Sequence, residues 1–499
     1  MIPIEIINKS QKVIKVMRKF LILFLFVPLV LVLKIEAVGN DKQTNSDSRQ
    51  SFLNEKHFSP GSVILGRPTD HSITLSILWN KDVSVVIRYG IEEKLDKKTG
   101  LVELKTGEPK EVVIDNLQPD TEYYYSVIAS SAQKSLLPIT GNGRFHTQRN
   151  KGKSFIFTMQ ADSHLDENCS LSLYEQTLRN TLSSNPDFHI DLGDTTMVGK
   201  IPDRSMAVRQ YEAQRYWLSQ ICHSAPLFLV IGNHDGEEAF KNGPINEDGL
   251  AVWAALQRKH YFSNPLSDDF YTANTQPQRY AGMLQDYYSW EWGDALFVVL
   301  DPYWYSQGTR GGSEPWNMTL GKPQYDWLAK TLRTSKAKFK FVFIHQLVGG
   351  SDNGSRGGVE FAPLYEWGGH EKNGENTFAA NRPGWEKPIH SLLVETGVTI
   401  LFHGHDHFFA KQELDGVIYQ LVPQPASRNS QKDHAREYGY GKGAFLPSPG
   451  FLRVSVNPKK VTVDYIRTVN ENLQGYTTIA NTKSTYSYTI EDHIEKDSK

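Results

Sequence analysis

The sequence predicts an α/β domain preceded by an all-β domain, and a change in pattern near residue 150 indicates the boundary. Residues 58–148 contain short β-branched runs in which apolar and polar positions alternate, which is typical of antiparallel sheets. From residue 153 onward, apolar runs alternate with amphipathic stretches, which is typical of βαβ units. A chain of 499 residues, 39% of them hydrophobic, is long enough for two or three cores.

The first 38 residues have the features of a secretory signal. Basic residues at 12–19 precede the apolar stretch 20–33, which is short for a membrane-spanning helix. We therefore expect an exported protein, secreted, periplasmic or at the cell surface, with no membrane span once the signal is cleaved. An uncleaved signal would leave the protein anchored in the membrane, and Met17 is an alternative start. Residues 39–57 are polar and predict a flexible leader.

The charge balance and the cysteines argue against some functional classes. The chain has 54 basic and 56 acidic residues and a net charge of -2, so we expect no nucleic-acid partner. Cys169 and Cys222 could pair in an exported protein or could both remain free thiols. Neither cysteine has the neighbours of a cysteine metal site.

Residues 58–150 are predicted to form the all-β domain. Its β-rich runs lie at 72–77, 83–89 and 112–114. After them, Leu117, Pro119, Thr121 and Tyr123 occupy alternate positions. This pattern resembles the corner of a fibronectin type III sandwich, in which a tyrosine near the start of one strand bonds back to the preceding turn. We expect the domain to be a spacer or a wall beside the active site, with carbohydrate or partner binding as the alternative.

Residues 153–470 are predicted to form the α/β domain, and residues 471–499 a C-terminal extension. Apolar runs predict strands at 155–160, 188–192, 227–231, 295–300, 339–344 and 398–402. Amphipathic stretches predict helices at 171–182, 206–222, 324–332 and 388–396. Three later strands without helices between them, at 416–422, 451–456 and 461–466, predict an antiparallel flank. The loops 236–286 and 346–387 follow strand ends directly, as lids and specificity elements do.

Polar side chains follow five of these strands at their carboxyl ends. They are Asp162 and His164, Asp194, the Gly-Asn-His-Asp segment at 232–235, His345, and the segment 403–407 with its three histidines. Open α/β sheets bind ligands at such ends, so we expect these side chains to converge. Carboxylate, imidazole and amide groups suit divalent first-row metals. The set exceeds what one ion needs and fits two ions that share a bridging carboxylate; the alternative is that these residues only terminate strands.

The ordered blocks Asp-x-His, Gly-Asp, Gly-Asn-His-Asp, a lone His and Gly-His-x-His resemble those of the calcineurin-like metallophosphoesterase family over residues 153 to about 425. The resemblance implies a four-layer α/β/β/α domain that holds two divalent metal ions, which could be Mn, Fe or Zn. The residues implied for one ion are Asp162, His164, Asp194 and His407. Those implied for the other are Asp194, Asn233, His345 and His405, with Asp194 as the bridge.

The same resemblance implies that a hydroxide bridging the two metals attacks a small-molecule phosphate ester, with His234 as proton donor to the leaving oxygen. Asp235 is a second catalytic candidate, because a carboxylate beside an imidazole can fix its orientation. Three loop arginines are candidates to bind the phosphate, because guanidinium groups suit bidentate phosphate contacts. They are Arg310, Arg356 and Arg382.

A weaker resemblance, which covers both domains, is to the purple acid phosphatases, which carry a fibronectin-like domain before this catalytic domain. Those enzymes have a tyrosine three residues after the bridging aspartate, where this chain has Met197. A tyrosinate ligand to ferric iron is therefore not expected. We expect a phosphomonoesterase of the acid-phosphatase type. A phosphodiesterase or nucleotide hydrolase is the alternative within the class, and a surface binding protein with a catalytically silent domain is the alternative outside it.

Overall fold

The computed structural model describes most of the chain from residue 61 onward. The described ranges are 61–92, 94–130, 137–138, 143–166, 168–201, 203–307, 315–349, 356–427, 431–469 and 483–492. The predicted signal at 1–38 and the polar leader at 39–57 lie outside them. Within these ranges, no helix is both long and apolar enough to cross a membrane.

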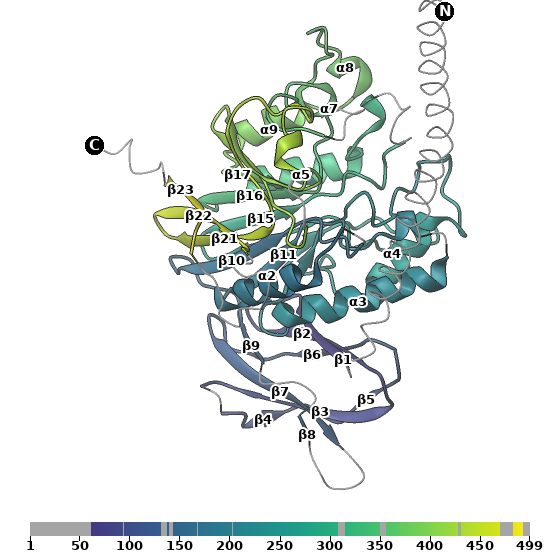
Figure 1. The fold of residues 1–499 in the computed structure, drawn as a ribbon, viewed down its shortest axis with the longest axis vertical. Helices are drawn as coiled ribbons and strands as arrows, with labels where there is room; N and C mark the ends of the chain where they lie inside the picture. Colours follow the sequence, from purple (N-terminus) through teal and green to yellow (C-terminus); the bar gives the residue numbers. More distant parts are fainter. Residues whose placement is uncertain are drawn as a thin grey trace, which may run out of the picture. The chain divides into compact units, whose positions relative to one another are not determined.

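The all-β domain consists of two antiparallel sheets that share one core (Figure 1). One sheet has the order β1 (Gly61–Gly66), β2 (Ile73–Trp79), β6 (Lys110–Ile114). The other has the order β4 (Lys97–Lys98), β3 (Val83–Gly90), β7 (Glu122–Ser130), β8 (Leu137–Pro138), with β5 (Val102–Leu104) also on β3 and β9 (Gly143–His146) also on β7. The Tyr123 hydroxyl accepts a hydrogen bond from the Gln118 amide at 2.9 Å, which confirms the predicted tyrosine corner.

The α/β domain contains two larger sheets. The six-stranded sheet has the order β12 (Leu227–Leu229), β11 (Phe188–Asp191), β10 (Phe155–Gln160), β21 (Gly450–Asn457), β22 (Lys460–Arg467), β23 (Tyr486–Glu491). The eight-stranded sheet has the order β13 (Thr272–Ala273), β14 (Tyr288–Trp292), β15 (Ala295–Val299), β16 (Phe339–Ile344), β17 (Ile400–His403), β19 (Val417–Leu421), β18 (Phe409–Leu414), β20 (Ala444–Leu446). The two sheets share one aromatic core, in which the rings of Phe157 and Phe297 meet edge to face at 5.1 Å.

Helices cover the outer face of each sheet, which completes the four layers implied by the family resemblance (Figure 1). On the six-stranded sheet lie α2 (Leu171–Ser183) and α3 (Arg204–Cys222). On the eight-stranded sheet lie α5 (Lys322–Thr334), α7 (Tyr365–Gly368) and α9 (Ile389–Glu395). Shorter or peripheral helices are α4 (Leu250–Tyr261), α8 (Phe378–Asn381), η2 (Val198–Lys200), η3 (Pro315–Asn317) and η4 (Lys432–His434). The predicted fold class is therefore confirmed.

The structure corrects three details of the predicted organisation. The predicted extension at 471–499 contains β23, which pairs with β22 and widens the six-stranded sheet past residue 470. In the predicted antiparallel flank, β21 and β22 do pair antiparallel, but β19 lies in the other sheet, parallel to β17 and antiparallel to β18. The loops 236–286 and 346–387 contain α4, and α7 and α8, respectively. The pairing of β23 with β22 joins strands that are distant in the sequence, and that of β19 with β17 joins strands separated by β18, so local periodicity could not indicate them.

Helix α3 joins the all-β domain to the α/β domain. Arg215 of α3 is fully buried, and its guanidinium donates to Ser62 Oγ at 3.2 Å, to Ser76 Oγ at 3.0 Å and to the Ser76 carbonyl at 3.0 Å. It also donates to the Tyr261 carbonyl at the end of α4. A buried guanidinium must have its donors satisfied, so these bonds fix α3 against the first sheet of the sandwich.

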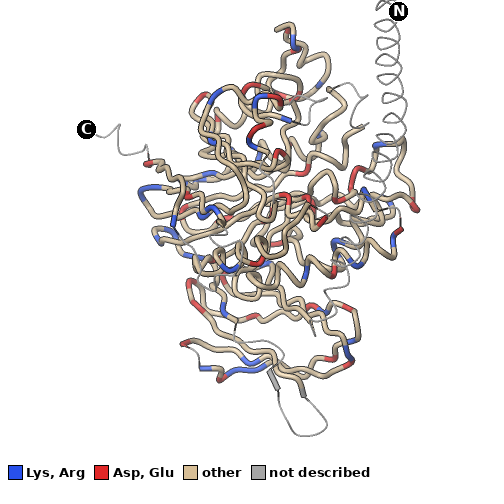
Figure 2. The backbone as a smooth tube through the Cα atoms, viewed as in Figure 1, with Lys and Arg blue, Asp and Glu red and all other residues tan. Residues whose placement is uncertain are grey.

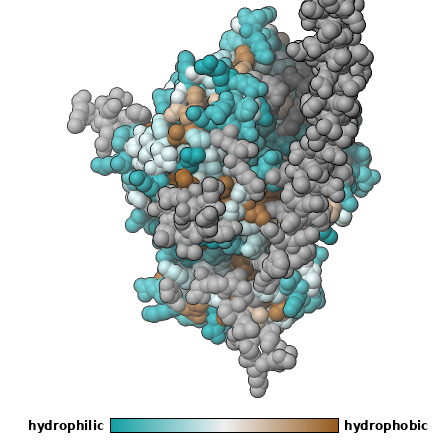
Figure 3. All heavy atoms as spheres, viewed as in Figure 1, coloured by the Kyte–Doolittle hydropathy of each residue, from teal (hydrophilic) through white to brown (hydrophobic). Residues whose placement is uncertain are grey.

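The described surface is polar and mixed in charge. Figure 2 shows Lys and Arg interspersed with Asp and Glu along the described backbone, in keeping with the near-zero net charge. On the face shown in Figure 3, hydrophilic residues predominate and hydrophobic ones form small separate areas. A surface of this kind gives no reason to expect binding to a polyanion.

Candidate metal centre

The predicted ligands come together where the strands of both sheets end. Strands β10, β11 and β12 are parallel, as are β16 and β17, so the loops after them lie at corresponding edges of the two sheets. Asp162 and Asp194 follow β10 and β11, and Asn233 follows β12. His345 and the segment 403–407 follow β16 and β17. The convergence that the sequence predicts therefore exists.

The first group of possible ligands consists of Asp162, His164 and His407. Asp162 Oδ1 lies 3.4 Å from His407 Nε2 and 3.8 Å from His164 Nε2. The two imidazole rings meet edge to face with centroids 4.6 Å apart. Asp162 is fully buried, and the His164 side chain is only 6% exposed. These residues are separated by up to 245 positions in the sequence, and the two-sheet packing brings their possible ligand atoms within 4.8 Å of one another.

The second group consists of Asp194, His345 and His405, with Asn233 beside it. His345 Nε2 lies 3.5 Å from Asp194 Oδ2 and 3.2 Å from Asn233 Oδ1. The other ring nitrogen of His345 donates to the Leu192 carbonyl at 2.7 Å, with the proton assigned to Nδ1 by that contact. This bond fixes the tautomer and leaves the Nε2 lone pair facing the carboxylates.

Asp194 lies between the two groups. Its Oδ2 is 3.4 Å from His164 Nε2 of the first group and 3.5 Å from His345 Nε2 of the second. His345 Nε2 is also 3.7 Å from Asp162 Oδ1, so the two groups share one pocket of ligand atoms. This is the position that a bridging carboxylate would occupy.

The donor atoms fit a pair of divalent cations. Within the described chain, Asp162 Oδ1, Asp194 Oδ2, His164 Nε2 and His405 Nδ1 are buried and have no hydrogen-bond partner. The two carboxylate oxygens lie 3.4 to 3.8 Å from the Nε2 atoms of His164 and His407, farther than an ordinary hydrogen bond of about 2.7–3.2 Å. Atoms that each lie about 2.0–2.2 Å from a shared Zn-like ion would be spaced in this way. The oxygen and imidazole donors, without a thiolate, suit Mn, Fe or Zn.

Charge within the site supports the same interpretation. Although burial opposes ionisation, the imidazoles of His407 and His345 hold the pKa of Asp162 well below its usual value. In the same way, His345 and His164 hold the pKa of Asp194 below its usual value against the effect of burial. Both carboxylates are therefore ionised at neutral pH, as metal ligands must be.

The backbone at the ligands is held in an uncommon conformation. Asp162, His164, Asp194, His405 and His407 all have a positive φ, between 52° and 75°. Non-glycine residues rarely adopt this region, and they are retained there when the surrounding structure enforces it. The Asp162 amide donates to the Gly193 carbonyl at 2.9 Å, and the His164 amide donates to the Asp194 carbonyl at 3.0 Å. These bonds hold the loops after β10 and β11 in a conformation that directs the side chains of Asp162, His164 and Asp194 toward one another.

The close approach of two of these loops requires glycine. A Cβ at Gly232 would lie 2.0 Å from the Asp194 amide nitrogen, and a Cβ at Gly193, where φ is 93°, would lie 2.4 Å from the Gly232 nitrogen. Any side chain at either position would therefore push the Asp194 loop away from the Asn233 loop.

Asp235 does not orient the imidazole beside it, contrary to the sequence prediction. Its Oδ2 accepts from the amides of Asp194 at 3.0 Å and Gly232 at 2.7 Å. Its Oδ1 accepts from the Thr196 amide at 2.8 Å and the Thr196 hydroxyl at 2.9 Å. Burial, reinforced by the negative charge of Asp194, raises the pKa of the Asp235 carboxyl to about 7. The carboxyl therefore organises the loop of the bridging aspartate, a contact that sequence adjacency to His234 could not indicate.

His234 lies at the edge of the candidate centre. Its amide donates to Asp194 Oδ1 at 2.7 Å, and its Nε2 lies 3.9 Å from Asp194 Oδ2. The ring is 5.7 Å from the His164 ring, and the side chain is 12% exposed, more than that of His164. The imidazole is thus beside the metal ligands and still within reach of a bound substrate.

The three candidate arginines have different outcomes. Arg310 lies outside the described residues. Arg356 Nη1 donates to Asp406 Oδ1 at 2.7 Å, and its guanidinium stacks on the Tyr438 ring at 4.3 Å. Because Asp406 lies between His405 and His407, this pair braces the loop that presents both histidines.

Arg382 is not available to bind phosphate. Its guanidinium pairs with the fully buried Glu366 and donates to the carbonyls of Asn381 at 2.9 Å, Trp316 at 2.6 Å and Met318 at 3.1 Å. All three of its nitrogens are therefore used to hold the segment before α5 against α7 and α8. The sequence shows a loop arginine but not the buried glutamate that it serves.

Two glutamines of α3, which the sequence analysis did not identify, support the ligand loops. Gln210 Nε2 donates to the His164 carbonyl at 3.0 Å, and its Oε1 accepts from the Met197 amide at 2.7 Å. Gln214 Nε2 donates to Ser163 Oγ at 2.8 Å and to the Thr195 carbonyl. Both side chains are buried, and the i, i+4 spacing of the two glutamines, which places them on the same face of the helix, was the available indication.

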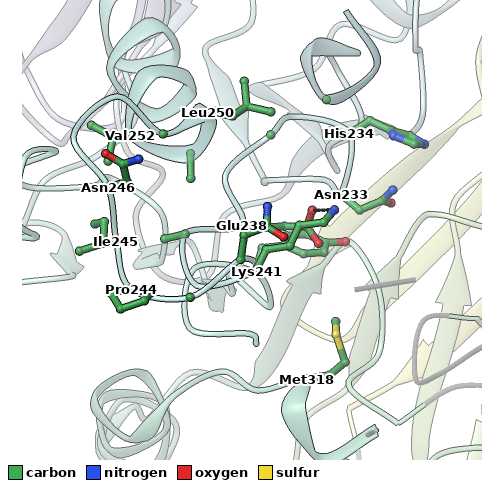
Figure 4. A pocket seen from close by; sticks show the side chains of 18 of the residues that line it. Asn233, His234, Glu238, Lys241, Pro244, Ile245, Asn246, Leu250, Val252 and Met318 are labelled. Carbon is green, nitrogen blue, oxygen red and sulfur yellow. Dashed lines mark hydrogen bonds and ion pairs between the residues drawn. The ribbon is translucent and has the colours of Figure 1, made fainter. Parts of the chain in front are cut away.

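A pocket of about 470 Å³ opens beside Asn233 and His234. Its far wall is the segment 243–246 together with the start of α4. Figure 4 shows Asn233 and His234 at one end of this pocket and Pro244, Ile245 and Asn246 at the other. The candidate metal centre therefore adjoins a space large enough for an organic molecule of drug size, for which pockets are about 300–1,000 Å³.

Comparisons with known proteins identify the family and support the fold. The sequence profile described as calcineurin-like phosphoesterase matches residues 157–409. The structure titled "Structure of PhoD" is similar with a TM-score of 0.61 and 16% identity, over 86% of this chain and 90% of that one. A purple acid phosphatase, PPD1 from yellow lupin (Lupinus luteus) seeds, is similar with a TM-score of 0.54 and 14% identity, over 87% of this chain and 75% of that one. No curated protein matches in sequence. At such identities the two structures support the fold alone.

Proposed function

The chain belongs to the calcineurin-like phosphoesterase family and is a metal-dependent phosphoester hydrolase, and on this premise we propose that it is an exported phosphomonoesterase with His234 as its proton donor. The observation that supports this best is the convergence of Asp162, Asp194 and His345 with further histidines from the other loops at 3.4 to 3.8 Å. An organic phosphate fits the adjoining pocket.

The proposed ligand sets are those that the sequence predicts. Asp162, His164 and His407 would hold one ion, Asn233, His345 and His405 the other, and Asp194 would contact both. When bound, the two ions lower the pKa of water and neutralise phosphate oxygens, which favours hydrolysis near neutral pH.

The role of His234 follows from its position. In the hydrolysis of a monoester, a water oxygen becomes bonded to phosphorus, and the bond from phosphorus to the alcohol oxygen breaks. The alcohol oxygen must gain a proton to leave as a neutral alcohol. His234 Nε2 is 3.9 Å from Asp194 Oδ2 and lines the pocket, so it can donate that proton from the side of the departing group. Inorganic phosphate is the second product.

Other residues of the chain keep these groups in place. Asp235 holds the amides around Asp194, and the Leu192 carbonyl fixes the His345 ring. Gln210 and Gln214 tie α3 to the ligand loops, and Arg356 braces Asp406. Such supporting bonds set ligand orientation and commonly change metal affinity about 10- to 100-fold when lost.

A substrate comparison tests the proposal. The metal-loaded full chain should hydrolyse p-nitrophenyl phosphate faster than bis-(p-nitrophenyl) phosphate. His234→Ala should lower kcat by about 10²- to 10⁴-fold. His434→Ala is the matched control, because this exposed histidine in η4 contacts Glu437 and the Tyr438 ring rather than a candidate ligand, and the substitution should leave kcat unchanged. A strong preference for the diester would contradict the proposed phosphomonoesterase activity and would indicate a phosphodiesterase. Full activity of His234→Ala would remove the proposed proton donor.

Export is proposed from the sequence of residues 1–38. Expression of the full chain, followed by fractionation and amino-terminal sequencing of the mature protein, tests it. A mature terminus near residue 38 in a soluble exported fraction would support cleavage. Recovery of the intact amino terminus in the membrane fraction would support an anchored form, and recovery inside the cell would contradict export.

A further inference from the structure

The far wall of the pocket beside His234 is mainly apolar, with Ile245, Leu250, Ala251 and Val252, and Asn246 is its polar member. Ala239 and Met318 add apolar lining elsewhere in the pocket. Ala239 and Ile245 pack against the cluster formed by Ala251, Val252 and Trp304, so the segment 236–249 is folded against α4. A preformed apolar wall of this kind favours an apolar ligand surface, because burial removes that surface from water.

The charges that line the pocket largely cancel. Glu238 and Lys241 form an ion pair at 2.7 Å, and Figure 4 shows them close together between the two ends of the pocket. Among the described lining residues, the other basic side chains are Lys200, which is exposed, and the proposed proton donor His234. A leaving group that carries several negative charges would therefore find little compensation here.

Among the described residues, no group forms a hydrogen bond with the hydroxyl of Tyr303. Tyr303 lines the pocket with 1% of its surface exposed, and within the described chain its buried hydroxyl has no hydrogen-bond partner. A buried hydroxyl without a partner costs about 1–3 kcal/mol. Its ring lies 6.2 Å from the His345 ring, beside the second group of ligands.

The backbone around Tyr303 is fixed. Asp301 accepts from the Tyr303 amide at 2.8 Å and from the Trp304 amide at 3.3 Å, and Trp304 Nε1 donates to Gln278 at 3.1 Å. Burial and the charges of Asp194 and Glu238 raise the pKa of the Tyr303 hydroxyl, so it is a donor at neutral pH. The fixed backbone keeps the Tyr303 hydroxyl from turning toward another partner in the protein. A buried polar group held in this way is typical of a site where a ligand supplies the hydrogen bond.

We infer that this pocket binds the organic group of the substrate, that this group is an uncharged alcohol with an apolar or aromatic body, and that Tyr303 donates a hydrogen bond to a phosphoryl oxygen at the inner end. The inference rests on the proposed function, because the phosphoryl group is placed at the candidate metal centre. His234 in the pocket wall then protonates the alcohol oxygen, and the alcohol extends toward Ile245 and Leu250.

Three esters of primary alcohols separate this inference from the proposed function, because their leaving groups have similar acidity. They are 2-phenylethyl phosphate, ethyl phosphate and glucose 6-phosphate. The wild-type enzyme should have a kcat/KM for the phenylethyl ester at least about tenfold above that for the other two, since one methylene alone is worth about 10- to 200-fold in a closed apolar pocket. Hydrolysis with equal or higher efficiency on glucose 6-phosphate overturns the apolar assignment. Absence of hydrolysis of any ester, p-nitrophenyl phosphate included, refutes the proposed function instead.

Two substitutions in α4 test the location of the apolar site. Leu250 lines the pocket and is 38% exposed, so Leu250→Trp should fill the pocket without overpacking the core. It should lower kcat/KM for the phenylethyl ester at least about tenfold and that for ethyl phosphate less than about twofold. Leu256 is 44% exposed in the same helix and does not line the pocket, so Leu256→Trp is the matched control. Equal effects of the two variants overturn the location.

Tyr303→Phe tests the hydroxyl separately. It should lower kcat/KM about 10- to 100-fold for all three esters alike and should raise the inhibition constant of inorganic phosphate. Its melting temperature should stay equal or increase, because an unpaired buried hydroxyl is removed. Tyr288→Phe is the control, since that buried hydroxyl donates to the Leu229 carbonyl at 2.8 Å; it should lower stability and leave phosphate inhibition unchanged. An unchanged inhibition constant in Tyr303→Phe overturns the role of Tyr303.

Discussion

Substitution of Asp235 by asparagine distinguishes the role seen in the structure from the role expected from sequence adjacency. The carboxylate accepts two hydrogen bonds at each oxygen, from Asp194 and Gly232 on one and from Thr196 on the other. Asparagine keeps an acceptor for one pair and presents an NH2 group to the other pair of donors. Two bonds are lost and two buried donors are left unpaired. At about 1.5 kcal/mol each, the free energy of unfolding should fall by about 3 kcal/mol.

Metal binding should weaken in the same variant, because the lost bonds hold the loop of Asp194. Chemical unfolding and elemental analysis of dialysed Asp235→Asn measure the two effects. Asp326→Asn is the control; its ion pair with Lys322 is exposed at an i, i+4 spacing in α5 and should contribute about 0.3–0.5 kcal/mol. If Asp235→Asn keeps its stability and metal content while the pH profile of kcat shifts, the carboxylate orients His234 and the structural interpretation is wrong.

Three further outcomes follow from the contacts described above. A chelator should abolish turnover and lower the melting temperature, because ions that bind only the folded chain stabilise it. Mn²⁺ or Zn²⁺ should restore both, and an unchanged melting temperature would argue against a buried metal centre. Arg382→Met should lower the free energy of unfolding by about 3–5 kcal/mol, because it leaves the buried Glu366 without its ion-pair partner. KM of the folded fraction should not change. A raised KM at full stability would show instead that Arg382 binds the phosphate. Tyr123→Phe should lower stability by about 1 kcal/mol and leave kcat unchanged, as unfolding and activity assays on one preparation would show.

The sequence by itself determined the fold class, and it predicted a division into two domains and the positions of the candidate metal ligands. Each of these depends on local information. Strand periodicity extends over about six residues, and the polar blocks at 162–164, 194, 232–235, 345 and 403–407 each follow directly on an apolar run. Because parallel strands align their carboxyl ends, these local positions were sufficient to predict convergence.

The tertiary structure alone decided which partner each side chain serves. Asp235 accepts hydrogen bonds from Asp194 and Thr196 rather than from the imidazole next to it. Arg382 forms an ion pair with a buried glutamate of α7, Glu366. The unused hydroxyl of Tyr303 likewise appears only when its surroundings are known. Such contacts join residues that are tens to hundreds of positions apart, and their geometry depends on how the two sheets and their helices pack. The sequence gives the chemical type of each side chain, but the packing of the whole domain decides which group it forms a hydrogen bond with.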